Sequence, residues 1–455
     1  MNKIITMTIL LAVSFLMAED LQFDDFFVKK TMRIDFYQTG NATDTIISID
    51  QFREEPIWAG STVNLIDNLE LGEHCVKVYD ESSGKLIFSR GFNSIFAEYV
   101  TTRPALEGEF KTYHNTVLIP YPKNTIDVKF FTKNRNNHWV DEFTTAIDPD
   151  SRFINHDPPK YNFAVKTYLD HGDPTKKVDI LILSEGYTKD EMTIFREDIK
   201  KMLEVLFDTE PFKSERDKFN VRSIETPSEE SGVDDPRAGK FYNTFYDLTY
   251  NTLDIDRYVQ GCNNKVMRDV AALAPYDQIY FIMNSDKYGG GGIYNFCSIC
   301  YSPSQEKDPE WWPAYAFVHE FGHSFAGLAD EYYSSEVSYN DMYPVDVEPW
   351  EFNITTATKR ELVKWQNLIN LNTEIPTDWG KEEYESIPRS DTKAKYDFVK
   401  AHKNWGKIGV YEGAGYSSKG VYRPYMDCRM FSKSLVPFCP VCEEGLRKVI
   451  KYYTE

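Results

Sequence analysis

The string His319-Glu320-Phe321-Gly322-His323 is an HExxH pattern, whose residue types and spacing can build a metal site. Residues four apart on a helix share one face, so both imidazoles can reach one Zn²⁺ ion at roughly 2.0–2.1 Å. Glu320 follows the first histidine and points beside the metal, where it can take a proton from a bound water. The pattern predicts His319 and His323 as zinc ligands and Glu320 as the catalytic base.

A third ligand is expected just after the helix that carries this pattern. Pro313 fits the beginning of such a helix, and Gly327 fits its end because glycine tolerates the left-handed conformation of a C-cap. A catalytic zinc needs three protein ligands and one open position for water. A carboxylate past the glycine bend is placed to be the third ligand, and Asp330 is favoured over Glu331.

Another class of metallopeptidase takes its third ligand from a glutamate on a separate downstream helix. Glu348 or Glu351 could play that part here. Because Pro344 and Pro349 interrupt residues 344–350, this stretch does not read as a helix. This alternative is therefore less favoured.

The longer string HEFGHSFAGLADEY, followed by Tyr422-Arg-Pro and by Phe438-Cys-Pro-Val-Cys442, resembles the bacterial IgA-specific metalloendopeptidase family. The resemblance covers roughly residues 160–455 and extends more broadly to the metzincin zinc peptidases, whose usual pattern is HExxHxxGxxH followed by a Met-turn. Here Ala326 occupies the usual glycine position and Gly327 comes one residue later. Asp330 keeps the usual step of three residues from glycine to ligand, although it is not a histidine.

The resemblance implies a zinc endopeptidase with a metzincin-like catalytic domain and a methionine that forms an apolar floor beneath the metal. It favours Met430 for that methionine, with Met426 as the alternative. The family name implies immunoglobulin A as a substrate. Because specificity depends on pocket shape and loops, we carry over the chemistry and not the target.

Length and composition indicate a multidomain globular protein. The chain has 455 residues, 42% of them hydrophobic, and a formal net charge of −20, which disfavours nucleic acid or an anionic membrane as a partner. Residues 1–18 read as a signal peptide, with basic Lys3, an apolar stretch from Ile4 to Met17 and a cleavage point after Ala18. We therefore expect an exported protein that is periplasmic, attached to the cell surface or secreted, with no integral membrane segment after signal removal.

In residues 19–150, apolar and polar residues alternate over short stretches, as in β-strands. Residues 32–36 and 126–130 have a period of two, and residues 76–88 read as a hairpin. These features predict an all-β sandwich without a catalytic cluster. Such a module also fits the layout of the resembled family.

Residues 151–455 have the pattern of an α/β (α+β) catalytic domain. Strands are expected at residues 178–183, 219–226 and 278–283. Thr188 and Glu191 form a capping box that opens a helix, and apolar residues recur along it at core-facing spacing. Gly289 to Gly292 lack a phosphate-loop pattern, and a flexible turn into an edge strand over the active site is expected there.

The seven cysteines lie at positions 75, 262, 297, 300, 428, 439 and 442. The two CxxC pairs, Cys297/Cys300 and Cys439/Cys442, are farther apart than in a compact four-cysteine zinc motif. Because an exported protein meets an oxidising compartment, structural disulfides are favoured, and the odd count leaves at least one thiol free.

The chemistry expected of the chain is hydrolysis of peptide bonds in a protein or peptide substrate, with Zn²⁺ as cofactor. One alternative is a non-catalytic binding protein or adhesin in which zinc is purely structural. The presence of Glu320 disfavours it, because a structural site has no use for a general base.

Overall fold

The computed structural model describes residues 21–261, 263–305, 311–334, 342–344, 346–388 and 390–455. The expected signal peptide at residues 1–18 and Cys262 lie outside these residues. The strands are β1 (Phe27–Gly40), β2 (Thr45–Glu55), β3 (His74–Asp80), β4 (Leu86–Phe92), β5 (Lys111–Pro122), β6 (Ile126–Lys133), β7 (Trp139–Ile147), β8 (Ile154–Asn155), β9 (Val165–Leu169), β10 (Val178–Glu185), β11 (Phe219–Ile224), β12 (Gln278–Met283), β13 (Gly290–Ile293), β14 (Cys297–Tyr301), β15 (Tyr411–Ala414) and β16 (Ser417–Arg423). The helices are α1 (Phe23–Phe26), α2 (Ile95–Tyr99), α3 (Arg103–Leu106), α4 (Met192–Asp208), α5 (Asn264–Ala271), α6 (Trp311–Ala326), α7 (Lys381–Ser386), α8 (Thr392–Ala401) and α9 (Pro440–Thr454).

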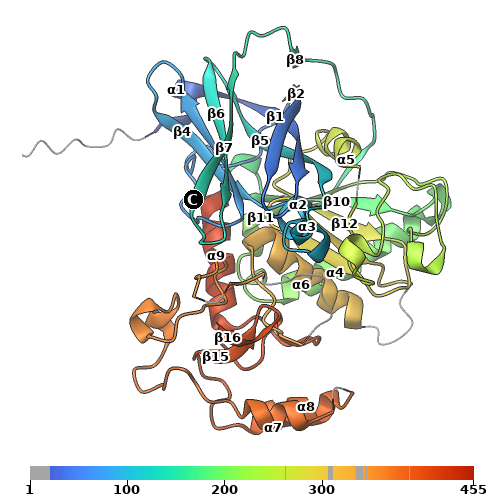
Figure 1. Cartoon of the computed structure of the whole chain (residues 1–455). Coiled ribbons are helices and arrows are strands. Elements are labelled where there is room, and N and C mark those ends of the chain that lie inside the picture. Colours follow the sequence, from blue (N-terminus) through green and yellow to red (C-terminus); the bar gives the residue numbers. More distant parts are fainter. Residues whose placement is uncertain (1–20, 262, 306–310, 335–341, 345, 389) are drawn as a thin grey trace, which may run out of the picture.

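The N-terminal part contains two four-stranded sheets, in the orders β5-β1-β2-β8 and β4-β3-β6-β7 (Figure 1). Inward-facing residues of both sheets, such as Ile34 of β1 and Val128 of β6, share one hydrophobic core. The expected hairpin is present, since β3 pairs with β4 in antiparallel register. The short helices α1, α2 and α3 lie among these strands, so this part is not purely β. The whole chain is a mixed α/β protein with its strands in several sheets.

The second part is built on a six-stranded sheet in the order β13-β14-β12-β10-β11-β9. The central strands β10, β11, β12 and β14 run parallel, and antiparallel β13 and β9 form the two edges. Strand β10 is buried along its whole length, which explains the apolar sequence of its centre, residues 180–183. The expected strands and the long helix α4 are present, and the capping box of Thr188 and Glu191 opens a 3₁₀ turn that leads into α4.

Helix α6 packs against β13 and β14, and also against α4 and α9 (Figure 1). Its sequence is apolar on most sides because it is enclosed by these elements. The C-terminal segment adds the hairpin β15–β16, the small helices α7 and α8, and helix α9, which runs back through the body of the molecule. This arrangement places α6 in the interior, where a metal site can be held rigidly.

The N-terminal part is joined to the second part by buried polar contacts. Arg33 of β1 is fully buried and its Nη1 lies 2.8 Å from Asp269 Oδ1 of α5. The guanidinium of Arg90 in β4 lies over the ring of Tyr453 of α9 and donates a hydrogen bond to Asn295 Oδ1 at 3.3 Å. These contacts fix the two parts relative to each other, because breaking them would leave charged groups buried without partners.

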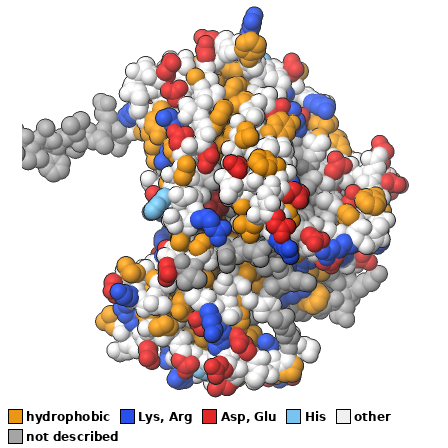
Figure 2. Space-filling model, viewed as in Figure 1, with side chains coloured by type: hydrophobic (Ala, Val, Ile, Leu, Met, Phe, Trp, Pro, Cys, Tyr) orange, Lys and Arg blue, Asp and Glu red, His pale blue; other side chains and the backbone are white. Residues whose placement is uncertain are grey.

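Acidic and basic side chains are interspersed over the face shown in Figure 2, so the net charge is not gathered into one patch there. In the described part of the chain, no helix is both long enough and apolar enough to cross a bilayer.

Candidate metal centre and active site

Helix α6 carries the HExxH pattern in its C-terminal half and ends at Ala326, as the sequence predicts. Gly327 has φ +58° and its N–H donates to His323 O at 2.8 Å, which closes the helix. A Cβ atom at this position would lie 2.5 Å from the ring of Trp350. The left-handed backbone and the close ring both require glycine here, and the chain turns back toward the two histidines.

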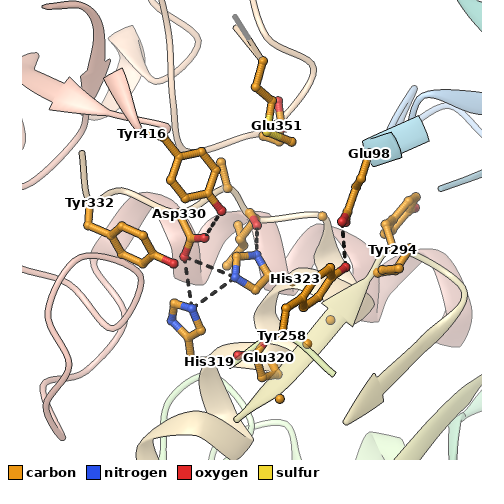
Figure 3. A pocket seen from close by; sticks show the side chains of 18 of the residues that line it. Glu98, Tyr258, Tyr294, His319, Glu320, His323, Asp330, Tyr332, Glu351 and Tyr416 are labelled. Atoms are coloured by element: carbon orange, nitrogen blue, oxygen red, sulfur yellow. Dashed lines mark hydrogen bonds and ion pairs between the residues drawn. The ribbon is translucent and has the colours of Figure 1, made fainter. Parts of the chain in front are cut away.

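Three candidate ligand atoms lie close together after this bend (Figure 3). His319 Nε2 and His323 Nε2 lie 3.1 Å apart, and Asp330 Oδ1 lies 3.1 Å from the first and 3.3 Å from the second. The expected side chains are therefore brought together, and these separations are those of atoms that share one metal ion.

The two imidazoles are oriented by backbone carbonyl groups. His319 Nδ1 lies 3.0 Å from Arg429 O, and His323 Nδ1 lies 2.5 Å from Leu328 O. A carbonyl oxygen can only accept, so each Nδ1 carries a proton and Nε2 is the nitrogen of each ring that is available to a metal. This is the tautomer that a metal ligand needs, held by the partners that usually surround such ligands.

Asp330 and Glu331 point to different places. Asp330 Oδ2 accepts a hydrogen bond from Tyr416 Oη, which leaves Oδ1 facing the histidines. Glu331 Oε1 accepts from Asn353 Nδ2 at 3.0 Å and contacts Cys442 Sγ at 3.1 Å. Among the described residues, the group that contains both histidines is completed by Asp330 and not by Glu331.

The glutamates considered as alternatives are engaged elsewhere. Glu348 accepts from Thr355 Oγ1 at 2.9 Å and pairs with Lys364 at 3.2 Å. Glu351 accepts from Tyr343 Oη at 2.8 Å. Neither belongs to the histidine group, and residues 346–352 form turns rather than a helix.

Glu320 lies on the face of α6 that contacts β13. Its side chain lines the same cavity as the histidines, and burial raises its pKa, as does the charge of Asp330, while the two imidazoles lower it. A Cβ atom at Gly292 would lie 2.2 Å from Glu320 O and 3.0 Å from His323 Cβ. The glycine run thus forms the edge strand β13, as the sequence predicts, and permits the close approach of α6.

The two candidate methionines occupy different clusters. Met430 is fully buried, and its sulfur lies 3.2 Å from the position that a Cβ atom would take at Gly322, beneath the HExxH turn. Met426 packs instead with Trp379 and Val399, away from this helix. The position of Met430 suits an apolar floor beneath the histidines.

The histidines open into a cavity of about 420 Å³ to which both parts of the chain contribute. Glu98 of α2 accepts a hydrogen bond at 2.7 Å from Tyr258, which also lines the cavity (Figure 3). Arg257 also lines the cavity, and its guanidinium donates to Tyr332 Oη at 3.3 Å. Sequence reasoning missed these residues because single Arg, Glu and Tyr residues outside a motif carry no pattern.

Cys75, Cys300, Cys428, Cys439 and Cys442 are free and buried, so the expectation of structural disulfides is wrong for these five described cysteines. Cys428 Sγ and Cys442 Sγ lie 3.7 Å apart, far beyond the ~2.05 Å of a disulfide. The two CxxC pairs are also separate, because Cys297 and Cys300 lie on β14 while Cys439 and Cys442 begin α9.

Family comparison agrees with the resemblance seen in the sequence. The model of the family described as IgA Peptidase M64 matches residues 167–394 and 383–450. The chain belongs to the IgA Peptidase M64 family. A second model, described as Peptidase M64 N-terminus, matches residues 22–144. No curated protein is similar enough to count as a match.

Membership in this family makes the chain a peptidase, with a protein or peptide as substrate. The M64 family model spans both the α6 motif and the segment that contains Met430 and Cys442. The residues gathered around the cavity are therefore the candidate active site of an M64 peptidase.

Proposed function

We propose that this M64 peptidase is a zinc-dependent endopeptidase whose ligands are His319, His323 and Asp330 and whose general base is Glu320. The observation that supports this most directly is the triangle of Nε2, Nε2 and Oδ1 atoms, with sides of 3.1, 3.1 and 3.3 Å. Ligands about 2.0–2.1 Å from a tetrahedral ion are about 3.3–3.4 Å from each other. Two neutral imidazoles and one carboxylate are a donor set suited to zinc, with one position open.

In this proposal the bound Zn²⁺ would lower the pKa of a water and polarise the scissile carbonyl. Glu320 accepts the proton of that water and then delivers it to the leaving amine. Arg429 O and Leu328 O hold the imidazoles in the required tautomer, and Tyr416 holds Asp330 by its second oxygen. The raised pKa of Glu320 suits a residue that must both take and return a proton.

We propose that an extended substrate pairs with the outer side of β13. This side is already partly occupied, because Val259 N–H donates to Gly290 O at 3.0 Å and Asn93 N–H donates to Tyr294 O at 2.9 Å. Alternate residues of a strand direct their backbone groups to the same side, so Gly292 is the position left between them for a substrate. Strand β14 is internal, so this pairing is confined to β13.

We further propose that Arg257 stabilises the negative charge that develops on the substrate oxygen. Its guanidinium lines the cavity and lies within electrostatic reach of Asp330. A fixed donor aimed at such charge is worth about 10²–10³ in kcat.

Two finer expectations also remain proposals. The order of helix, glycine bend, carboxylate ligand and buried methionine supports a metzincin-like catalytic domain, preceded by a β-sandwich module up to about residue 150. The apolar stretch at residues 4–17 supports export, and detection of the mature N-terminus outside the cytoplasm by sequencing would test this.

Glu320→Gln tests the central proposal. The variant should bind zinc with unchanged stoichiometry and lose peptide hydrolysis by about 10²–10⁴-fold or more. Glu204→Gln, on the exposed face of α4, serves as the control and should keep full activity. A fully active Glu320→Gln protein would contradict the mechanism and favour the non-catalytic alternative.

A further inference from the structure

A second group of metal-ligand side chains lies behind the candidate active site, and the proposed reaction does not use it. Glu331, Cys428, Cys439 and Cys442 are all buried, and one ligand atom of each lies within 4.8 Å of those of the others. They come from three segments: the turn after α6, the loop after β16, and the first turn of α9. Convergence of three thiols and a carboxylate in the interior requires an explanation, because a buried carboxylate is costly unless it is paired or bound.

We propose that these four residues bind a second zinc ion, with a structural role distinct from the ion proposed at His319 and His323. Four protein ligands leave no open position, which is the mark of a structural site. Cysteine-rich donor sets select zinc over magnesium or calcium.

The distances fit a shared tetrahedral ion. Thiolates about 2.3 Å from zinc are about 3.7–3.8 Å from each other. Cys428 Sγ and Cys442 Sγ lie 3.7 Å apart, and Cys442 Sγ lies 3.1 Å from Glu331 Oε1. Cys428 Sγ and Cys442 Sγ are therefore too far apart for a disulfide and correctly spaced to bind one metal ion.

The surroundings suit thiolates and an ionised carboxylate. Cys439 N–H donates to Cys428 Sγ at 3.2 Å, and Cys439 is the N-cap of α9, where the helix dipole favours negative charge. Glu331 Oε2 is buried and accepts no hydrogen bond from any residue in the described ranges. The fully buried Arg423 lies within electrostatic reach of Glu331 and can offset part of the excess negative charge of a ZnCys₃Glu centre.

This centre would hold the active site in place through two short segments. Glu331 follows Asp330 directly, and its N–H donates to Met430 O at 2.8 Å. Cys428 precedes Arg429, whose carbonyl oxygen orients His319. A metal bound to Cys428 and Glu331 would therefore hold Asp330 at a fixed position relative to the segment that orients His319.

Metal analysis of the full chain tests the proposal. Protein purified under reducing conditions should contain two zinc ions per chain, and X-ray absorption should show sulfur at about 2.3 Å besides nitrogen and oxygen. The double variant His319→Ala/His323→Ala should keep one zinc ion with a sulfur-rich shell. The zinc content of this variant distinguishes the two sites, because an ion lost from one site leaves the ion at the other site to be measured.

Cysteine variants complete the test. Cys442→Ser should lower the zinc content by one ion, while Cys75→Ser, a buried cysteine outside the cluster, should keep both. Because Cys442→Ser could fail to fold, cobalt substitution of the unmodified chain gives an independent readout, namely thiolate-to-cobalt charge-transfer absorption. One zinc ion without sulfur ligands, or a Cys428–Cys442 disulfide in peptide maps of the exported protein, would overturn the proposal.

Discussion

The carboxylates of Asp330 and Glu331 are consecutive in the chain and face two different clusters. Asp330 Oδ1 lies 3.1 Å from His319 Nε2, whereas Glu331 Oε1 lies 3.1 Å from Cys442 Sγ. Both residues lie in the segment after Gly327, which is neither helix nor strand, and their side chains point to different sides of it. One short segment thus serves both the proposed catalytic ion and the proposed structural one.

Asp330→Asn should weaken zinc at the histidine site while the protein stays folded, because the amide keeps the shape but loses the charge that the metal needs. We expect at least a 10–100-fold increase in the zinc dissociation constant, measured by chelator competition. Asp378→Asn, at an exposed position paired with Lys403, is the control. Unchanged zinc affinity in Asp330→Asn would exclude this residue as the third ligand.

Tyr416→Phe should reduce activity or zinc affinity by about 10–100-fold, since the hydroxyl that holds Asp330 Oδ2 is removed. The aromatic ring and its packing are retained, so the melting temperature should change little. Tyr396→Phe on α8, which is 41% exposed, provides a matched change without this contact. Equal activity of both variants would show that the hydroxyl does not position the ligand.

Gly292→Ala should separate β13 from α6, because the added methyl would lie 2.2 Å from Glu320 O. Overpacking of this kind costs about 1–3 kcal/mol of unfolding free energy and should also displace His323. Urea denaturation and zinc content measure the two effects. Gly84→Ala, at φ +65° with no neighbour within 4 Å, should lose only about 1–2 kcal/mol and keep its zinc.

Glu351 should make the protein less stable as the pH rises. Burial, with a further contribution from the charge of Glu73, raises its pKa from 4.5 to about 7. The folded state favours the neutral form of Glu351, so this group contributes its full stabilisation of the fold below pH ~4.5. The stabilisation is lost as the pH rises through about 7. The loss is on the order of 3 kcal/mol.

Glu351→Gln should remove this part of the pH dependence, since the amide cannot ionise. Thermal unfolding of both proteins between pH 4.5 and 8 measures the difference. Glu382→Gln on the exposed face of α7 should behave like the unmodified chain. Parallel stability curves for Glu351→Gln and the unmodified chain would contradict the prediction.

Arg33→Met should destabilise the whole molecule and not only the N-terminal part. The change would leave Asp35, Glu55 and Asp269 without their shared buried cation, and loss of one partner of a buried ion pair costs about 3–5 kcal/mol. Lys30→Met, whose partner Glu54 is near the surface, should cost at most about 1 kcal/mol. Calorimetry should show one transition; two separate transitions would mean that the parts unfold independently.

Local chemistry explains what the sequence could predict. The histidine spacing, the glycine after α6 and the apolar periodicity of α4 each follow from short-range geometry, and the family follows from the same residues. The contacts between distant residues were not predictable. No local pattern signals the hydrogen bond between Glu98 and Tyr258, or that Asp330 faces the histidines while Glu331 faces Cys442.

The cysteines show how a signal can be present and misread. The two CxxC pairs are too far apart in the chain to form a compact zinc motif with each other. Structural disulfides were therefore favoured. Cys428 lies only eleven residues before Cys439, and this shorter spacing unites the three thiols that the structure brings together. The fourth member, Glu331, comes from a distant segment and could be found only once the fold was known.

The hydrogen bond between Glu98 and Tyr258 joins two residues that line the cavity, one from each part of the chain. If the proposed function holds, a folded domain is too large for this cavity of about 420 Å³ to bring a peptide bond to His319 and Glu320. A locally unfolded stretch of substrate could pass, because a single extended strand is narrow enough to lie along Gly292. The enzyme would then discriminate first by the flexibility of a substrate at the point of cleavage, and by its amino-acid sequence only afterwards.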